Sequence, residues 1–158
     1  MAQENQKIDV GSKAPDFELL SQTGEKVRLS ELLKESCVVL FFYPRDGTPK
    51  CTSEACGFRD AHEQFAKAGA VVLGVSGDSV HSHRRFSSVY GLPYKILSDE
   101  DNAVRKLYGV PPTLGVLPGR VTFVIDREGI VRFVFSSQFR ANAHVQKALD
   151  MVRRLAQK

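Results

Sequence analysis

An apolar run in the first half of the chain leads directly into a pair of cysteines. Residues 37–43 are too uniformly apolar for a strand with one face in water, so they predict a strand at the centre of a sheet. A helical pattern follows over about 50–68 and ends at Gly69, with Cys51 at its start and Cys56 five positions later. A strand that runs straight into a helix favours an α/β fold and places Cys51 in the first helical turn.

This position favours the reactive form of the Cys51 thiol. The first turn of a helix offers backbone N–H groups without helical partners and the positive end of the helix dipole, and both stabilise a thiolate. Cys56 is close enough to react with an oxidised Cys51. The simpler interpretations are an inert thiol at Cys51 and a buried structural thiol at Cys56. A zinc site is a weaker alternative because it needs four ligands, and we interpret the nearest histidines, His81 and His83, as solvent-facing helix residues.

Strands and helices alternate along the rest of the chain. The expected elements are a hairpin over 18–29 that turns at 23–26, a short helix capped by Ser30, a buried strand over 70–75, a helix over about 79–90 capped by Asp78, a strand over 95–97, a short helix over 102–108, a hairpin over 121–135, and a final helix whose apolar stripe is Val145, Ala148, Leu149 and Val152. This order predicts one mixed sheet with helices on both faces.

Length and composition fit one soluble domain over residues 1–158, with a flexible segment at 1–7. The apolar share is 42%, and no apolar run reaches the ~18 residues that a membrane span needs, so we expect no membrane contact. The net charge is +4, but lysine and arginine are dispersed among nearly as many carboxylates, so we expect no nucleic-acid binding. The polar start lacks a secretory signal, which points to the cytoplasm, or to the plastid stroma if a transit peptide was removed.

The cysteine count bears on the redox chemistry. Three cysteines do not make a disulfide scaffold in a chain of 158 residues, and in a reducing compartment a cysteine pair is more often catalytic or metal-binding than structural. Cys37 begins the buried strand and has no counterpart in the pair, so we interpret it as a packed core thiol.

The residues around Cys51 resemble the active-site signature of peroxiredoxins. Pro44, Thr48 and Cys51 have the spacing of that signature, and the run over 43–56 is similar to that of the peroxiredoxin Q, or bacterioferritin comigratory protein, group. Further similar stretches occur in family order at 11–17, 58–60, 75–78, 97–100 and 118–126. The resemblance covers roughly residues 8–156, and it implies a thioredoxin-like fold with an N-terminal β-hairpin extension.

The resemblance also implies a role for each residue of the site. Cys51 would attack a peroxide and become a sulfenic acid, and Cys56 would resolve that acid as an intrachain disulfide. Thr48 would hold the peroxide in line with the sulfur, although a capping role at the helix start is the simpler interpretation. Pro44 would wall the pocket, and Arg120, remote in sequence, would reach the sulfur and bind developing negative charge.

Two nearby residues remain open from the sequence. Glu54 either supports the site through charge pairing or is an ordinary first-turn acid favoured by the helix dipole. Lys50 stands where related proteins commonly have glycine, and it adds a positive charge next to Cys51.

We therefore expect a thiol peroxidase that reduces hydrogen peroxide and organic hydroperoxides in antioxidant defence. The resemblance implies recycling by thioredoxin or a thioredoxin-like reductant, with no metal or other cofactor, since sulfur does the redox work. A monomer is expected, with a weak dimer as the alternative. Two other functions stay open: a general dithiol oxidoreductase, whose usual Cys-x-x-Cys motif is absent, and a peroxide sensor that passes its oxidation to a partner protein.

Overall fold

A computed structural model describes residues 8–110, 112–113, 117–118, 120–137 and 140–157. The expectation for residues 1–7 lies outside this part of the chain. The elements in chain order are β1 (Glu18–Ser21), β2 (Lys26–Arg28), α1 (Leu29–Leu32), β3 (Cys37–Phe42), α2 (Pro49–Asp60), α3 (His62–Lys67), β4 (Ala70–Ser76), α4 (Val80–Tyr90), β5 (Lys95–Ser98), α5 (Ala103–Leu107), β6 (Pro112–Thr113), β7 (Leu117–Pro118), β8 (Val121–Ile125), β9 (Val131–Ser136) and α6 (Ala141–Ala156).

Seven of these strands form one mixed sheet in the order β2-β1-β5-β4-β3-β8-β9. The central strand β3 pairs parallel with β4 and antiparallel with β8. The N-terminal hairpin pairs antiparallel with β5 and extends the sheet at one edge. The predicted mixed sheet with an N-terminal hairpin extension is confirmed.

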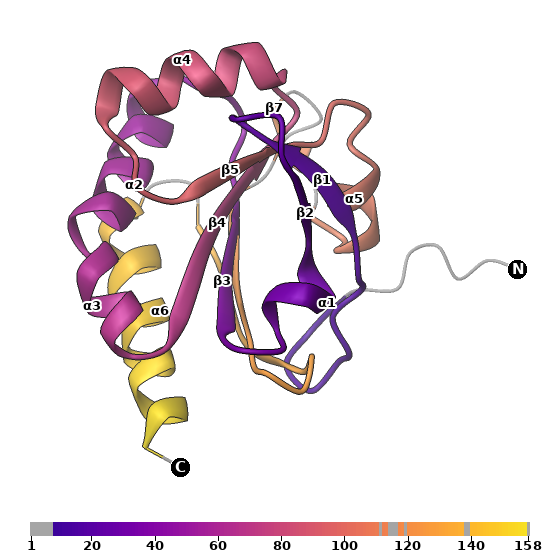
Figure 1. Cartoon of the computed structure of the whole chain (residues 1–158), viewed down its shortest axis with the longest axis vertical. Coiled ribbons are helices and arrows are strands. Elements are labelled where there is room, and N and C mark those ends of the chain that lie inside the picture. The colour runs from indigo at the N-terminus through magenta and orange to yellow at the C-terminus, as the bar shows by residue number, and fades with distance from the viewer. Residues whose placement is uncertain (1–7, 111, 114–116, 119, 138–139, 158) are drawn as a thin grey trace, which may run out of the picture.

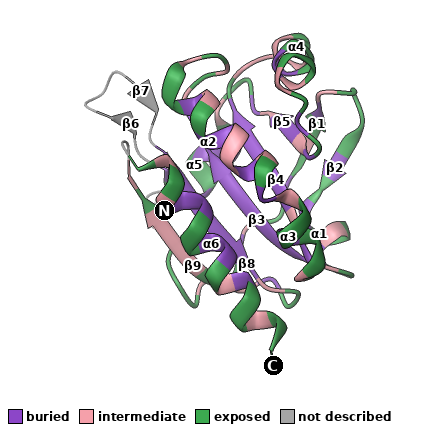
Figure 2. Ribbon diagram, turned by 90° about the vertical axis from the view of Figure 1, so that its left-hand side faces the viewer, coloured by how far each residue is buried: buried purple, intermediate pink, exposed green. Residues whose placement is uncertain are grey.

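Helices cover both faces of this sheet (Figure 1). Helices α2, α3 and α6 lie on one side, and α1 and α5 lie on the other. Successive side chains of a strand point to opposite faces, so Val39 and Phe41 pack into the core under α2, α3, α4 and α6, while Leu40 and Phe42 pack into the core under α1 and α5. Every residue of β3 is buried (Figure 2), as the apolar run predicts.

The register of the central strands determines where the site lies. β3 ends at Phe42, and the chain passes through a short loop into α2 at Pro49. Phe42 pairs with Val121, the first residue of β8. Arg120 therefore lies beside the end of β3 and close to the start of α2, although it is about seventy residues away in sequence.

Four local details differ from the sequence predictions. The helix expected over 50–68 is two helices, because Ala61 leaves the helical conformation at φ −96°, ψ 2°. Ser30 lies inside α1 rather than capping it, and its N–H donates to Asp16 Oδ1 at 2.9 Å. Ser79, not Asp78, caps α4 by accepting from Ser82 N. The short β6–β7 pair was not predicted, because two-residue strands carry no periodic signal.

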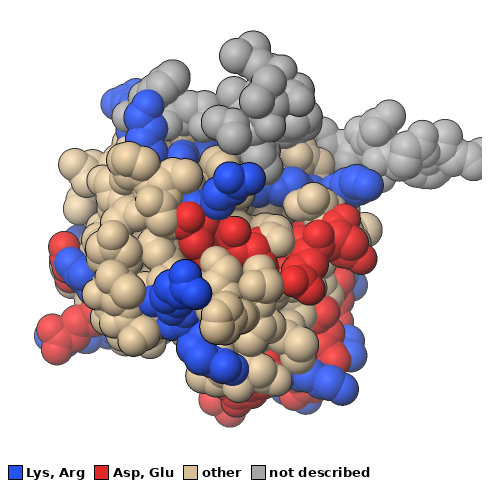
Figure 3. All heavy atoms as spheres, turned by 90° about the horizontal axis from the view of Figure 1, so that it is seen from above, with Lys and Arg blue, Asp and Glu red and all other residues tan. Residues whose placement is uncertain are grey.

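The surface carries charges of both signs. Figure 3 shows acidic and basic side chains interspersed over the face seen from above. No helix within the described residues is long and apolar enough to cross a membrane.

Candidate active site

Cys51 lies in the first turn of α2, as predicted. Thr48 is the N-cap residue, at φ −75°, ψ 153°, and Pro49 follows it at the first helical position, where a missing N–H costs nothing. The side chain of Cys51 is fully buried. A buried sulfur at a helix N-terminus faces the positive end of the dipole with little screening by water.

The guanidinium of Arg120 joins Cys51 to Glu54. Its Nη2 donates to Cys51 Sγ at 3.3 Å, and its Nη1 donates to Glu54 Oε1 at 2.7 Å. Arg120 and Glu54 are both buried, so their charges are hardly screened. The expected charge pairing of Glu54 is thus present, and the interpretation as an ordinary first-turn acid is wrong.

Burial and pairing shift the protonation of both partners. Burial raises the pKa of the Glu54 carboxyl to about 7, and the attraction of Arg120 opposes this rise only in part. Burial alone would lower the pKa of the Arg120 guanidinium, but the charges of Glu54 and Cys51 outweigh it, so that pKa is raised. Arg120 therefore remains a cation while Glu54 titrates near neutrality.

His144, on α6, borders the same cluster and was missed by the sequence reasoning. Its Nε2 lies 2.9 Å from the Ser137 carbonyl, and its Nδ1 lies 2.7 Å from Thr122 Oγ1 and 3.4 Å from Glu54 Oε2. Burial lowers the pKa of this histidine to about 4. The signal in the sequence was a histidine directly beside Val145, at the edge of an otherwise apolar helix stripe.

The loop between β3 and α2 carries Pro44 and Thr48. Both residues are partly buried. Thr48 Oγ1 donates to the Arg45 carbonyl at 3.4 Å and makes no capping hydrogen bond. Thr48 thus occupies the N-cap position, as the simpler interpretation has it, but without a capping hydrogen bond, and the contact of its hydroxyl with the Arg45 carbonyl is long.

Asp46 anchors this loop to the body of the protein. Its carboxylate accepts from Tyr43 Oη at 2.6 Å and from Ser82 Oγ at 2.8 Å, and it lies 2.7 Å from His83 Nδ1. Its N–H donates to Asp78 Oδ2 at 2.8 Å. The interpretation of His83 as solvent-facing is wrong: the ring is fully buried, with Nε2 2.9 Å from the Leu97 carbonyl. His81 is exposed, as expected.

The Asp46 cluster is better described as a hydrogen-bonded anchor than as a metal site. The ligand atoms of Asp46, Asp78 and His83 lie within 4.8 Å of one another. However, His83 Nδ1 contacts Asp46 directly, and Asp78 Oδ2 already accepts from Ser76 Oγ at 2.6 Å. The carboxylate lone pairs are directed at hydrogen-bond donors, and each ring nitrogen of His83 faces an acceptor, so these atoms are not directed at a shared centre.

A basic hollow of about 450 Å³ adjoins the site on the side of α6. Its lining consists of Lys50, Ser53, Arg120, Arg140 and residues 141–143. Cys56 lies further along α2, is partly buried, and is a free thiol like Cys51.

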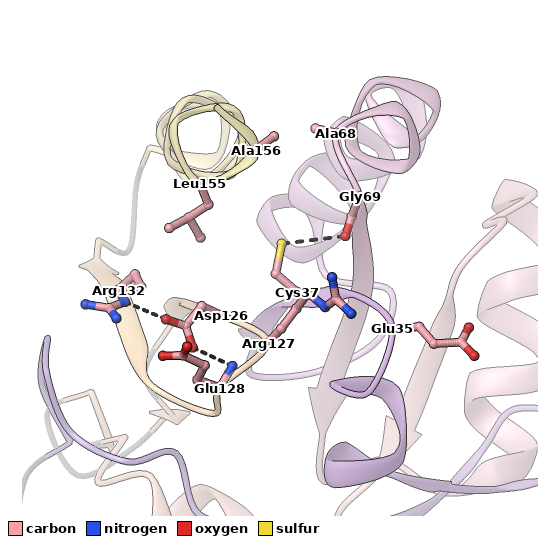
Figure 4. Close-up of a pocket in the computed structure, with 10 residues that line it drawn as sticks. All are labelled: Glu35, Cys37, Ala68, Gly69, Asp126, Arg127, Glu128, Arg132, Leu155 and Ala156. Atoms are coloured by element: carbon pink, nitrogen blue, oxygen red, sulfur yellow. Dashed lines mark hydrogen bonds and ion pairs between the residues drawn. The ribbon is translucent and has the colours of Figure 1, made fainter. Parts of the chain in front are cut away.

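Cys37 lies at the start of β3, at the opposite end of that strand from the active-site loop. Its thiol donates to the Gly69 carbonyl at 3.7 Å, and burial raises its pKa. Figure 4 shows it beside a pocket of about 480 Å³ between α6, the end of α3 and the β8–β9 turn. The interpretation of Cys37 as a packed thiol is confirmed.

Comparison with known proteins places this geometry in a family. The AhpC/TSA family matches residues 10–134. The chloroplastic peroxiredoxin Q of Suaeda salsa is 50% identical over 150 residues, which are 94% of this chain and 70% of that protein. The chain is a peroxiredoxin of the Q group.

Solved structures of the group share the whole fold. The peroxidoxin BcpB from Mycobacterium tuberculosis has a TM-score of 0.87 at 44% identity, over 94% of this chain and 98% of that one. The bacterioferritin comigratory protein of Xanthomonas campestris, described in a study of its alkyl peroxide reduction, has a TM-score of 0.82 at 30% identity, over 94% of this chain and 98% of that one. The predicted thioredoxin-like fold is confirmed, and this peroxiredoxin is a thiol-dependent peroxidase.

The Asp46 anchor leads to a prediction about stability. His83→Phe should lower the free energy of unfolding by about 2–4 kcal/mol, because it leaves Asp46 Oδ2 and the Leu97 carbonyl each short of a buried partner. Urea unfolding followed by circular dichroism measures this. The matched control, His81→Phe at an exposed position of the same helix, should change the value by less than about 0.5 kcal/mol. Equal effects of the two substitutions would contradict the anchor.

The opposite pKa shifts of Glu54 and His144 lead to a second prediction. From pH 4.5 to about 7 the folded protein keeps a proton on Glu54 that the unfolded chain has released, so this group lowers the free energy of unfolding as pH rises. From about pH 4 to 6.5 the unfolded chain keeps a proton on His144 that the folded protein excludes, so His144 raises the free energy of unfolding as pH rises. Where the two windows overlap, the contributions oppose each other.

Single substitutions should expose each contribution. Glu54→Gln should make the slope of the free energy of unfolding against pH more positive than in the wild type. His144→Gln should make this slope more negative. Each change in slope should be up to about 1.4 kcal/mol per pH unit. Urea unfolding at a series of pH values on both sides of 6 tests this. Changes of the same sign in the two variants would show that the groups do not titrate in opposite directions.

Proposed function

We propose that Cys51 is the peroxidatic residue of this peroxiredoxin and that Cys56 resolves it. The observation that carries this assignment is the 3.3 Å contact between Arg120 Nη2 and the buried Cys51 sulfur at the start of α2. A cation and a helix N-terminus both favour the thiolate, which is the nucleophile. Cys37, buried at the other end of β3, takes no part.

The first step oxidises Cys51. The thiolate attacks the terminal oxygen of a hydroperoxide, an S–O bond forms, and the O–O bond breaks with its electron pair on the departing oxygen. The product is a sulfenic acid, and the departing oxygen takes a proton to leave as water or an alcohol. Negative charge thus moves from sulfur to oxygen, and Arg120 lies where it can stabilise that charge.

Two loop residues prepare the peroxide for this attack. Thr48 can exchange its long contact to the Arg45 carbonyl for a hydrogen bond to the peroxide, at little cost. Pro44, partly buried and without an N–H, walls the pocket and offers no competing donor. The Asp46 anchor holds the loop that carries both residues.

The second step forms a disulfide. The Cys56 thiolate attacks the Cys51 sulfur, an S–S bond forms, and the S–O bond breaks to release water once the oxygen is protonated. A dithiol protein, thioredoxin or a relative, then reduces this disulfide by two exchange steps and becomes oxidised itself. The alkyl peroxide reduction named for the Xanthomonas campestris relative supports organic hydroperoxides as substrates beside hydrogen peroxide.

The proposed site needs only one chain. Cys51, Arg120, Glu54 and His144 all come from this polypeptide, which supports a monomer as the working unit, with a weak dimer as the alternative. Plastid stroma and cytoplasm are the candidate compartments, and the chloroplastic relatives favour the first. Cell fractionation with an antibody to this chain would decide between them.

The roles of the cysteines are tested by substitution. Cys51→Ser should abolish peroxide reduction, because a hydroxyl is far less nucleophilic than a thiolate. Cys56→Ser should reduce one equivalent of peroxide and accumulate a sulfenic acid that dimedone traps, and Cys37→Ala should turn over normally. The assay is NADPH loss coupled to thioredoxin and its reductase. Equal dimedone labelling of Cys51 and Cys56 would overturn the assignment, and sulfenic acid without turnover in the wild type would favour a sensor.

The intact α2 helix makes a conformational prediction. Residues five apart in a helix have Cα atoms roughly 8–9 Å apart, whereas a disulfide requires less than ~7 Å. Because Cys51 and Cys56 both lie within α2, the segment over about 48–58 must unwind to form the disulfide. Hydrogen exchange there should be markedly faster in the oxidised than in the reduced enzyme. Identical protection in both states, with the disulfide confirmed by mass spectrometry, would rule the unwinding out.

A further inference from the structure

One oxygen of Glu54 has no hydrogen-bond donor among the described residues. Oε1 accepts from Arg120, but Oε2 is buried and has no hydrogen bond to any described residue. A carboxylate shares its charge between both oxygens, so an ionised Glu54 would hold a charged atom that is buried away from bulk solvent and receives no hydrogen bond from a described residue. Such an arrangement is costly, whereas a protonated oxygen carries a hydrogen that can be directed at an acceptor.

The group that faces this oxygen is an acceptor. His144 Nε2 lies against the Ser137 carbonyl, which can only accept, so Nε2 carries the ring hydrogen. In the neutral ring Nδ1 then has a lone pair, toward which Thr122 Oγ1 donates at 2.7 Å. Glu54 Oε2 lies 3.4 Å from the same nitrogen. Two acceptors thus face each other, and a proton on Oε2 removes the repulsion between them.

The charge of Glu54 matters because Arg120 contacts both Glu54 and Cys51. An ionised Glu54 offsets the guanidinium charge at 2.7 Å, whereas a neutral Glu54 leaves that charge to the sulfur at 3.3 Å. We propose that His144 is a positioning residue that keeps Glu54 protonated and thereby leaves the charge of Arg120 available to the reacting sulfur. This inference rests on the proposed role of Cys51.

Arg120, Tyr94 and His144, which lie near Glu54, do not change charge near neutrality. Arg120, next to β8, remains a cation. The pKa of Tyr94, before β5, is well above its ordinary value because of burial, and its hydroxyl donates to the Ala55 carbonyl. His144 on α6 stays neutral, because burial holds its pKa at about 4. Burial places the pKa of Glu54 itself at about 7, so its charge changes in this range.

The test is the pH dependence of the peroxide reaction. The fully reduced, full-length enzyme is mixed with hydrogen peroxide in a stopped-flow instrument, and the second-order rate constant of Cys51 oxidation is measured on both sides of pH 7. In the wild type the rate constant should fall about tenfold as Glu54 ionises. Glu54→Gln, which is neutral at every pH, should lose this fall.

His144→Gln should move the fall by about one unit toward lower pH. A glutamine amide can donate a hydrogen bond to Glu54 Oε2, which the imidazole lone pair cannot, so it stabilises the carboxylate. His81→Gln, at an exposed position on α4, is the control and should keep the wild-type profile. A role of His144 in packing alone would change the rate equally at all pH values.

A second readout does not depend on turnover. The infrared spectrum of the reduced wild type at neutral pH should contain the C=O stretch of a buried carboxylic acid, which Glu54→Gln removes and His144→Gln weakens. A wild-type rate constant without a fall around neutrality, or a His144→Gln profile equal to that of the wild type, would overturn the inference. If the Cys51→Ser variant consumed peroxide at the wild-type rate, the proposed function itself would be overturned. Failure of this inference and failure of the proposed function are therefore distinguishable.

Discussion

The guanidinium of Arg120 holds the active site together. It contacts the sulfur of Cys51 with one nitrogen and the carboxyl of Glu54 with another, and all three groups are buried. A buried cation is tolerated only when it is paired, so Arg120 requires a partner, and each partner competes for its charge. The protonation of Glu54 therefore affects the sulfur, and the groups that surround Glu54 affect it in turn.

The sheet brings these groups together. The sulfur and the carboxyl lie on α2, one turn apart, because positions 51 and 54 share a helix face. Arg120 approaches from β8, whose antiparallel register with β3 brings it to the same end of the sheet. His144 arrives from α6, which packs over that face of the sheet. Three separate segments thus build one buried cluster, and none of them could form it alone.

A second cluster supports the loop above the sulfur. Asp46 is bound by a tyrosine, a serine and a histidine, and its N–H is bound by Asp78. Tyr43 directly follows β3, Asp78 lies just after β4, and Ser82 and His83 lie on α4, so the loop is attached close to rigid elements on two sides. Helix α2 must open for Cys51 and Cys56 to meet, whereas this anchor can stay in place.

The sequence by itself determined the central strand, the helix start at Cys51 and the alternation of the core, because these depend on local patterns of apolar residues and on backbone chemistry. The family resemblance also predicted Pro44, Thr48, Cys51, Cys56 and Arg120 as site residues. It did not show that His83 and His144 are buried, that Asp78 binds the loop rather than capping α4, or that Ala61 interrupts a helix. Only the tertiary structure decided these, because burial and hydrogen-bond partners depend on residues that are distant along the chain.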